Sequence, residues 1–145
     1  ENGNPHALPL PRPHVDGRYD YSFSGLKTAF INAVHNARQK GELLCDADLA
    51  ASFRYAVVSQ LVDKAMLAAR ELGLHKMVLA GGVSANRLLR REMEAACAKA
   101  GIPLYMPRLE LCGDNAAMIG SAAYYRLRRG ELADLSLNAR PALRL

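Results

Sequence analysis

The feature that most constrains the fold of this chain is an apolar–helical–apolar pattern between residues 76 and 106. The apolar run 76–80 ends in Gly81-Gly82 and predicts a buried strand, and 104–106 predicts a second strand between two prolines. Two strands joined through one helix form a parallel pair with a right-handed crossover. Helical patterns dominate the remaining sequence, so we expect an α/β fold that is helix-rich with a small sheet.

The helix between the two predicted strands has clear boundary signals. Ser84 is a suitable N-cap, and Gly101 and Pro103 end the helical pattern. The apolar period predicts these inward side chains: Leu89, Met93, Ala96, Cys97 and Ala100.

Three further helices are expected. The first begins at Ser24 and ends near Gly41, the second has Asp46 as its N-cap and ends before Gly73, and the last follows Asp114. The apolar face of the first carries Leu26, Phe30, Ile31 and Val34.

The chain divides into three regions by composition. Residues 1–20 contain four prolines and predict an extended connector. Residues 21–130 hold the helices and strands and form the main lobe, and 131–145 form a tail without a clear period. Alternating aromatic and polar residues over 19–23 predict one more short strand.

Composition permits several kinds of partner. Half of the 145 residues are hydrophobic, which suits one domain with a real core, and the net charge of +5 is compatible with RNA as well as with an ordinary globular surface. Three cysteines without a CxxC pair favour reduced thiols and a cytoplasmic location. No apolar run is long enough for a membrane span, and the first residues do not resemble a signal peptide. Since an initiator Met is absent, we expect the chain to begin inside a longer protein or to be processed.

The first candidate site is the glycine turn after the first strand. Gly81 and Gly82 lack Cβ atoms, so backbone N–H groups can approach a phosphate or nucleoside closely, aided by the positive end of the next helix. Asn86 can both donate and accept a hydrogen bond, which suits the edge of a base or sugar. A plain strand-to-helix turn is the alternative. The pattern is neither a P-loop nor a GxGxxG fingerprint.

The second candidate is Asp114, in the Gly113-Asp114-Asn115 sequence after the second strand. Its carboxylate would face a ligand or metal at the carboxyl edge of the sheet, where open α/β sheets bind ligands, and the glycine turn lies at the same edge. The alternative is that Asp114 only caps the following helix. Cys112 is interpreted as a packed thiol rather than a ligand.

The third candidate consists of Ser24 and Lys27, at the start of the first long helix. Lys27 can reach a phosphate or carboxylate, while a simple serine cap and a solvated lysine are the alternative. The four histidines form neither HxxxH nor HExxH, and no GxSxG is present, so a self-contained hydrolase or metal site finds little support.

Taken together, the candidate stretches resemble the TsaD family in order and spacing, over about residues 1 to 130. This family was long labelled O-sialoglycoprotein endopeptidase or glycoprotease. The segments 3–5 and 10–13 also look like its mid-chain sequence. The stretches that carry the resemblance are FSGLKT (23–28), AGGVSAN (80–86) and CGDNAAMI (112–119).

The resemblance implies an actin-like/Hsp70-like ATPase (ASKHA) fold with two related lobes around a cleft, of which this chain is most of the second lobe. The complete enzyme would transfer a threonylcarbamoyl group from threonylcarbamoyl-AMP to N6 of adenosine 37 in tRNAs that read ANN codons (t6A formation). Implied partners are the tRNA anticodon loop, the proteins of the t6A-forming complex and the N-terminal lobe, with no membrane.

The resemblance also assigns residues. Asp114 matches the single second-lobe ligand of a divalent metal, iron(II) first and zinc(II) as the alternative, whose two histidine ligands form an HxxxH motif in the first lobe. Asn86 matches an asparagine that contacts the nucleotide, above the Gly81-Gly82 turn, while Ser24 and Lys27 match a motif that lines the cleft. Where relatives often carry Thr or Ser, this chain has Gly113 before the aspartate.

Because the HxxxH ligands and the first-lobe phosphate loop are absent from the sequence, we expect the chain alone to be inactive and largely metal-free. Two other functions are considered: a non-catalytic ATPase-like lobe that docks partner subunits, and a metallopeptidase, as the older family label suggests. The peptidase lacks support in the sequence, which shows no catalytic base and no HExxH.

Overall fold

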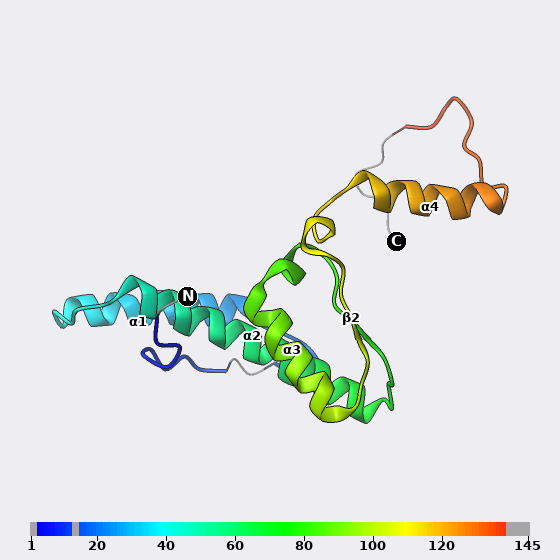
Figure 1. Cartoon of the computed structure of the whole chain (residues 1–145). Coiled ribbons are helices and arrows are strands. Elements are labelled where there is room, and N and C mark those ends of the chain that lie inside the picture. The colour runs from blue at the N-terminus through cyan, green and yellow to red at the C-terminus, as the bar shows by residue number, and fades with distance from the viewer. Residues whose placement is uncertain (1–2, 13–14, 139–145) are drawn as a thin grey trace. The chain divides into compact units, whose positions relative to one another are not determined.

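The computed structural model describes residues 3–12 and 15–138. Pro13 of the expected connector and the last part of the expected tail, 139–145, therefore lie outside the described residues. The chain forms two compact units, Glu1–Cys112 and Gly113–Leu145, and each is described by itself. Figure 1 follows the order of the elements along the chain.

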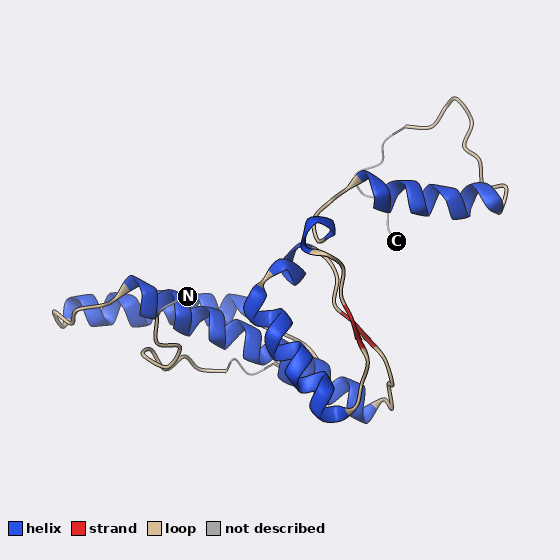
Figure 2. Ribbon diagram, viewed as in Figure 1, coloured by secondary structure: helices blue, strands red, loops and turns tan. Residues whose placement is uncertain are grey.

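The first unit contains the strand–helix–strand pattern that the sequence predicts. Strand β1 (Met77–Val78) pairs in parallel with β2 (Leu104–Tyr105), and helix α3 (Arg87–Ala100) connects them. The two short strands run beside each other in Figure 2. The backbone N–H of Met77 donates to the carbonyl of Pro103 at 3.0 Å, which fixes the register. The prediction of a helix-rich α/β fold with a small sheet is confirmed.

The core of the first unit lies between α3 and the long helix α2 (Asp46–Glu71), which lie side by side (Figure 1). Burying one large apolar side chain contributes about 1.5–3 kcal/mol, so this contact dominates the stability of the unit. The core cluster consists of Val58, Val62, Leu89, Met93 and Cys97.

The inward face predicted for α3 is correct at Leu89, Met93 and Cys97, but the prediction is wrong at its end, because Ala100 is exposed. There the helix stops at Gly101, whose positive φ of 67° closes the last turn.

The two strands are buried on one side only, which corrects the expectation that the run 76–80 forms a buried strand. Met77 and Leu104 pack against the core cluster. Because successive side chains of a strand alternate between faces, Val78 and Tyr105 point the other way and are 70% and 55% exposed.

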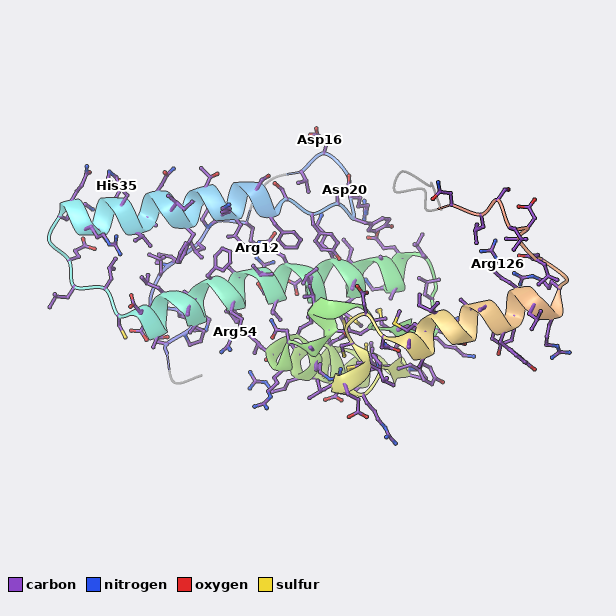
Figure 3. The ribbon with its side chains drawn as sticks, turned by 90° about the horizontal axis from the view of Figure 1, so that it is seen from above. Arg12, Asp16, Asp20, His35, Arg54 and Arg126 are labelled. Carbon is purple, nitrogen blue, oxygen red and sulfur yellow. The ribbon has the colours of Figure 1, made fainter. Side chains whose placement is uncertain are left out.

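Helix α1 (Phe23–Gln39) lies alongside α2 (Figure 3). The rings of Phe30 and Phe53 meet at 5.0 Å between centroids, and Leu26 is fully buried. Ile31, expected on the same apolar face, is 53% exposed, since its place on the helix turns away from α2.

The ends of α1 and α2 follow the predicted signals closely. Gly41 (φ 71°) and Gly73 (φ 62°) both adopt the left-handed conformation that follows a helix C-terminus. The start of α2 differs by one residue from the prediction: Cys45 occupies the N-cap position and Asp46 is the first helical residue.

The predicted strand over 19–23 is wrong. Phe23 is already helical, and the preceding residues run along α2 without joining a sheet among the described residues. The hydroxyl of Tyr21 donates to the Leu61 carbonyl at 3.4 Å, and that of Tyr19 donates to Glu71 at 2.8 Å. The alternating aromatics are thus explained by contacts with one helix.

The proline-rich segment before α1 is fastened along α2. The buried hydroxyl of Ser52 donates to the carbonyl of Asn4 and accepts from the N–H of Leu8, at 3.2 and 3.1 Å. Farther along, Arg12 forms an ion pair with Asp63 at 2.7 Å. The segment is held by polar contacts at several points of one helix. It also contains two turns, in which the N–H of Ala7 donates to the Asn4 carbonyl and that of Asp20 to the Gly17 carbonyl.

The second unit is built on α4 (Ala116–Arg128), and Arg126 and Arg129 form ion pairs with Glu131 just beyond it. Its apolar side chains, including Met118, Ile119 and Leu127, are exposed within this unit. Among the described residues, none of the helices is both long and apolar enough to span a membrane.

Candidate functional site

The glycine turn begins with a backbone conformation that only glycine adopts readily. Gly81 has φ 86° and ψ 171°, a region closed to residues with a Cβ. A Cβ built there would meet nothing within 4 Å, so the requirement for glycine is conformational and the space beside the turn is open. The turn therefore leaves its backbone accessible, as a ligand-binding turn requires.

Ser84 lies inside the turn and does not cap α3, which corrects the sequence prediction. It belongs to the short 3₁₀ helix η1 (Gly82–Ala85), is 1% exposed, and its hydroxyl donates to the Gly81 carbonyl at 2.6 Å. The N–H of Ser84 donates to the same carbonyl at 2.9 Å. Two hydrogen bonds to one carbonyl fix the shape of the turn.

Asn86 is the N-cap of α3. Its side-chain oxygen Oδ1 accepts from the N–H groups of Leu88 and Leu89, at 3.0 and 3.3 Å. These bonds satisfy two of the orphan donors at the helix start and hold the Asn86 amide in one place. The nucleotide contact expected of Asn86 remains a prediction, and it would have to use the amide donors because the oxygen already accepts twice.

Arg90 ties the glycine turn to the loop after β2, and sequence reasoning missed it. Its Nη1 donates to the Ser84 carbonyl at 3.1 Å, its Nη2 donates to the Pro107 carbonyl at 2.9 Å, and Nη1 lies 3.8 Å from Sγ of Cys112. No sequence signal marks Arg90, because its half-buried position and its acceptors depend on where the two loops lie in the fold.

Cys112 is a packed thiol, as predicted. It is 4% exposed, and its Sγ donates to the carbonyl of Arg108 at 3.4 Å. All three cysteines are free thiols.

Asp114 lies in the second unit and does not cap α4, so the alternative interpretation of this residue is wrong. The N-cap is Asn115, whose Oδ1 accepts from the N–H of Met118 at 3.0 Å and whose Nδ2 donates to the Gly113 carbonyl at 3.0 Å. Asp114 is exposed at the edge of an open hollow of about 340 Å³. Its carboxylate is therefore accessible to a ligand.

Ser24 and Lys27 are both exposed on the first turns of α1. Ser22 holds the N-cap position there, so the simple cap expected of Ser24 is wrong. Within the described residues, neither side chain bonds to the glycine turn; the Oγ of Ser24 lies 3.5 Å from that of Ser22. Their role in a cleft stays a prediction.

The described residues contain no group of three or more His, Cys, Asp or Glu side chains that could hold a metal ion. Asp114 can thus supply one ligand to a shared site, while the other ligands would have to come from residues beyond those described.

The fold and these turns define the class of protein. It is an α/β protein with a glycine turn at the carboxyl end of a parallel strand, next to an asparagine-capped helix, and this is where such sheets bind ligands.

Sequence comparison gives the family. The profile of TsaD, tRNA N6-adenosine threonylcarbamoyltransferase, matches residues 1–121. The tRNA N6-adenosine threonylcarbamoyltransferase of Moorella thermoacetica is 53% identical over 144 residues, which cover 99% of this chain and 42% of the relative. That of Symbiobacterium thermophilum is 50% identical with the same coverage, and that of Latilactobacillus sakei is 56% identical over 86% of this chain and 37% of its own length. The chain belongs to the TsaD family and spans about two fifths of the length of these relatives.

Proposed function

We propose that the protein containing this chain forms t6A. It transfers the threonylcarbamoyl group of threonylcarbamoyl-AMP to N6 of adenosine 37 in tRNAs that read ANN codons. The observation that carries this proposal is the match to relatives named for that transferase, at 53% identity over nearly the whole chain. The exocyclic amine of adenine is a weak nucleophile, so the enzyme must position it and activate the acyl carbonyl.

The architecture we propose is the second lobe of an actin-like/Hsp70-like (ASKHA) ATPase fold. The small parallel sheet with helix α3 and the long helix α2 beside it support this assignment. The first lobe would be supplied by sequence that the relatives have and this chain lacks, and a ligand cleft would lie between the lobes.

In this arrangement the residues of the first unit bind the nucleotide. The open backbone at Gly81 and Gly82 accommodates the adenylate at close range, next to the positive end of α3. The Asn86 amide, held by its capping bonds, donates to the nucleoside. Ser24 and Lys27 line the cleft, where the Lys27 ammonium suits the phosphate.

We assign Asp114 as one ligand of a divalent metal ion, iron(II) first and zinc(II) as the alternative. An exposed carboxylate outside the helix cap fits such a role, and two histidines of the first lobe would complete the set. The chemistry that such an ion would supply there is Lewis-acid polarisation of the acyl carbonyl. Asp114 itself holds the ion against the second lobe and lowers the local positive charge.

The other partners follow from the reaction. The target base must leave the stack of an anticodon loop, and single-stranded loops are where proteins bind RNA by sequence and stacking. We propose the cytoplasm as the location, because the substrate tRNA is there, together with partner proteins of a t6A-forming complex.

The function is tested with Asp114→Ala in the full-length protein, supplied with its partner proteins and an unmodified tRNA. We expect t6A, measured by mass spectrometry of digested tRNA, to fall more than about a hundredfold, since even outer-shell partners of a metal contribute about 10–100-fold. Metal content should fall in parallel. The matched control is Asp134→Ala, an exposed carboxylate of the same unit.

The two possible failures are distinct. Unchanged modification by the Asp114→Ala variant would remove Asp114 from the site and leave the transferase in place. Absence of t6A with the unaltered full-length protein and its partners would overturn the function itself.

A further inference from the structure

A basic hollow lies where α2 approaches the start of α3, outside the glycine turn. It has a volume of about 550 Å³, and three arginines from the two helices face it. Only one carboxylate, that of Glu92, lines it among the described residues. The side chains that define what we term the arginine surface are Arg54, Arg87, Arg91 and Tyr55.

Arg54 carries an unsatisfied donor at this surface. Its Nε is buried and has no hydrogen-bond partner among the described residues. Figure 3 shows Arg54 on the side of α2 that faces away from α1. A guanidinium has five N–H donors in a planar fork that matches phosphate oxygens, and Arg54 lines the hollow, so its side chain suits an anionic ligand there.

The other two arginines lie on one face of α3. Arg87 and Arg91 are four residues apart in the first turns of the helix, where the helix dipole adds positive potential. Arg91 forms an ion pair with Glu92 at 3.0 Å, yet its side chain remains 73% exposed. Among the described residues, three guanidinium groups and one carboxylate line the hollow.

An aromatic ring, that of Tyr55, borders the same hollow. Tyr55, next to Arg54 in α2, is 37% exposed, and His6 meets it edge to face at 4.8 Å between ring centroids. Arginines interleaved with an exposed aromatic ring are the combination that binds single-stranded nucleic acid, because phosphates pair with guanidinium groups and bases stack on rings.

The surface also lies next to the candidate nucleotide site, since Arg87 directly follows Asn86 in the chain. A base that enters the site brings the sugar–phosphate backbone of its neighbours with it. We propose that the arginine surface binds the backbone of the tRNA anticodon stem-loop that flanks the target adenosine. This inference rests on the proposed function and adds the place at which this lobe holds its RNA substrate.

The test compares two triple variants of the full-length protein with equal loss of charge. Arg54→Gln, Arg87→Gln and Arg91→Gln neutralise the arginine surface, while Arg38→Gln, Arg70→Gln and Lys99→Gln neutralise three exposed cations elsewhere on the same unit. The probe is an unmodified tRNA that reads an ANN codon, with its dissociation constant measured over a series of salt concentrations. Binding of threonylcarbamoyl-AMP is measured on the same samples to monitor the fold.

We expect the surface variant to bind tRNA on the order of ten- to a hundredfold more weakly, with the slope of log affinity against log salt smaller by about 2, because each lost phosphate contact removes roughly 0.7 from the slope. Adenylate binding and the control variant should be unchanged. Equal weakening by both variants would reduce the effect to net charge and overturn the proposal. The proposal would also be overturned if the surface variant bound tRNA normally but no longer bound a partner protein. An unaltered protein that forms no t6A would instead count against the proposed function.

Discussion

At the scale of single residues, Asn86 combines two tasks that need different atoms of one amide. Its oxygen accepts from the N–H groups of Leu88 and Leu89 and so begins α3. The two N–H groups of the amide nitrogen Nδ2 are separate from this oxygen and can donate to a ligand. A structural and a ligand-binding role are therefore compatible in this side chain, and substitutions can separate them.

We predict that Asn86→Ser and Asn86→Ala have the same effect on the adenylate and different effects on the helix. Serine keeps a capping oxygen and lacks the amide donors, whereas alanine lacks both. Loss of the cap costs about 1 kcal/mol, so amide hydrogen exchange at Leu88 and Leu89 should accelerate roughly fivefold in the alanine variant alone. Both variants should lose affinity for threonylcarbamoyl-AMP. If Asn86→Ser binds the adenylate normally, Asn86 acts only as a cap.

The same few residues show how far sequence reasoning reaches at this scale. The need for glycine at position 81 was predictable, because a turn between strand and helix has few other solutions, and its φ of 86° agrees. Ser84 and Asn86 are both good capping residues; the sequence predicted the cap at Ser84, and the structure places it at Asn86. The extra 3₁₀ turn, η1, moves the helix start past Ser84, and it depends on the buried bond from the Ser84 hydroxyl to the Gly81 carbonyl.

At the scale of elements, Arg90 is the side chain that joins the ends of two strands. It reaches from α3 to the turn after β1 through Ser84 and to the loop after β2 through Pro107. Hydrogen bonds from a charged donor contribute about 1.5–3 kcal/mol each, and their loss leaves half-buried carbonyls without a partner. The two loops are thus held in register by one residue.

We predict that Arg90→Met loosens both loops together. Hydrogen exchange of the backbone amides over 84–86 and 111–112 should accelerate by about tenfold or more, corresponding to one lost charge-assisted bond at each loop. The matched control is Arg91→Met, on the next residue, whose guanidinium pairs with Glu92. Faster exchange in only one of the two segments would show that Arg90 does not couple them.

A second link between elements fastens the segment before α1 to the C-terminal end of α2. Arg18 and Tyr19 both donate to the carboxylate of Glu71, and Lys64 donates to the Arg18 carbonyl at 2.6 Å. The hydrogen bonds from Arg18, first, and from Tyr19 hold the pKa of the Glu71 carboxyl below its ordinary value. The hydrogen bond between Tyr19 and Glu71 also raises the pKa of the Tyr19 hydroxyl.

This link should weaken in acid. Because the pKa of Glu71 is lower in the folded chain than in the unfolded one, the contact stabilises the fold fully above the ordinary glutamate pKa of about 4.3, and that contribution is lost as the pH falls through the lowered value. Proteolysis by pepsin within 15–22 should therefore increase in acid. Glu71→Gln should make this segment susceptible even at a milder pH, while Glu94→Gln, an exposed carboxylate of α3, should not. Equal cleavage of the two variants within 15–22 would contradict the role of Glu71 in fastening this segment.

The elements themselves were predictable where a periodic pattern coincides with a packed face. The α3 face with Leu89 and Met93 follows directly from the helical period, and so does the parallel pair on either side of it. The alternating pattern over 19–23 led to a wrong strand prediction, because Tyr19 and Tyr21 contact one helix instead of a neighbouring strand. An alternating pattern does not show whether its aromatic side chains pack against a sheet or a helix.

At the scale of the whole molecule, the candidate site residues belong to different compact units. The glycine turn and Asn86 belong to one compact unit and Asp114 to the other, and the chain spans 42% of the length of its Moorella thermoacetica relative. Sequence motifs identify such residues one at a time. The interactions that would bring these residues together are long-range. Their shared position at the carboxyl edge of the sheet, and the position of Ser24 and Lys27 in a cleft, therefore stay predictions.

The division predicts how metal binding depends on chain length. A single exposed carboxylate does not compete with water for iron(II) or zinc(II), and the described residues offer no cluster of three donors. The 145-residue chain should therefore show no saturable binding at micromolar metal in calorimetry, whereas the full-length protein should bind one ion and lose it on Asp114→Ala. The same substitution in the short chain identifies adventitious binding, for example at the exposed thiol of Cys45. Tight binding by the short chain that depends on Asp114 would mean that this chain holds further ligands, and the shared site would have to be abandoned.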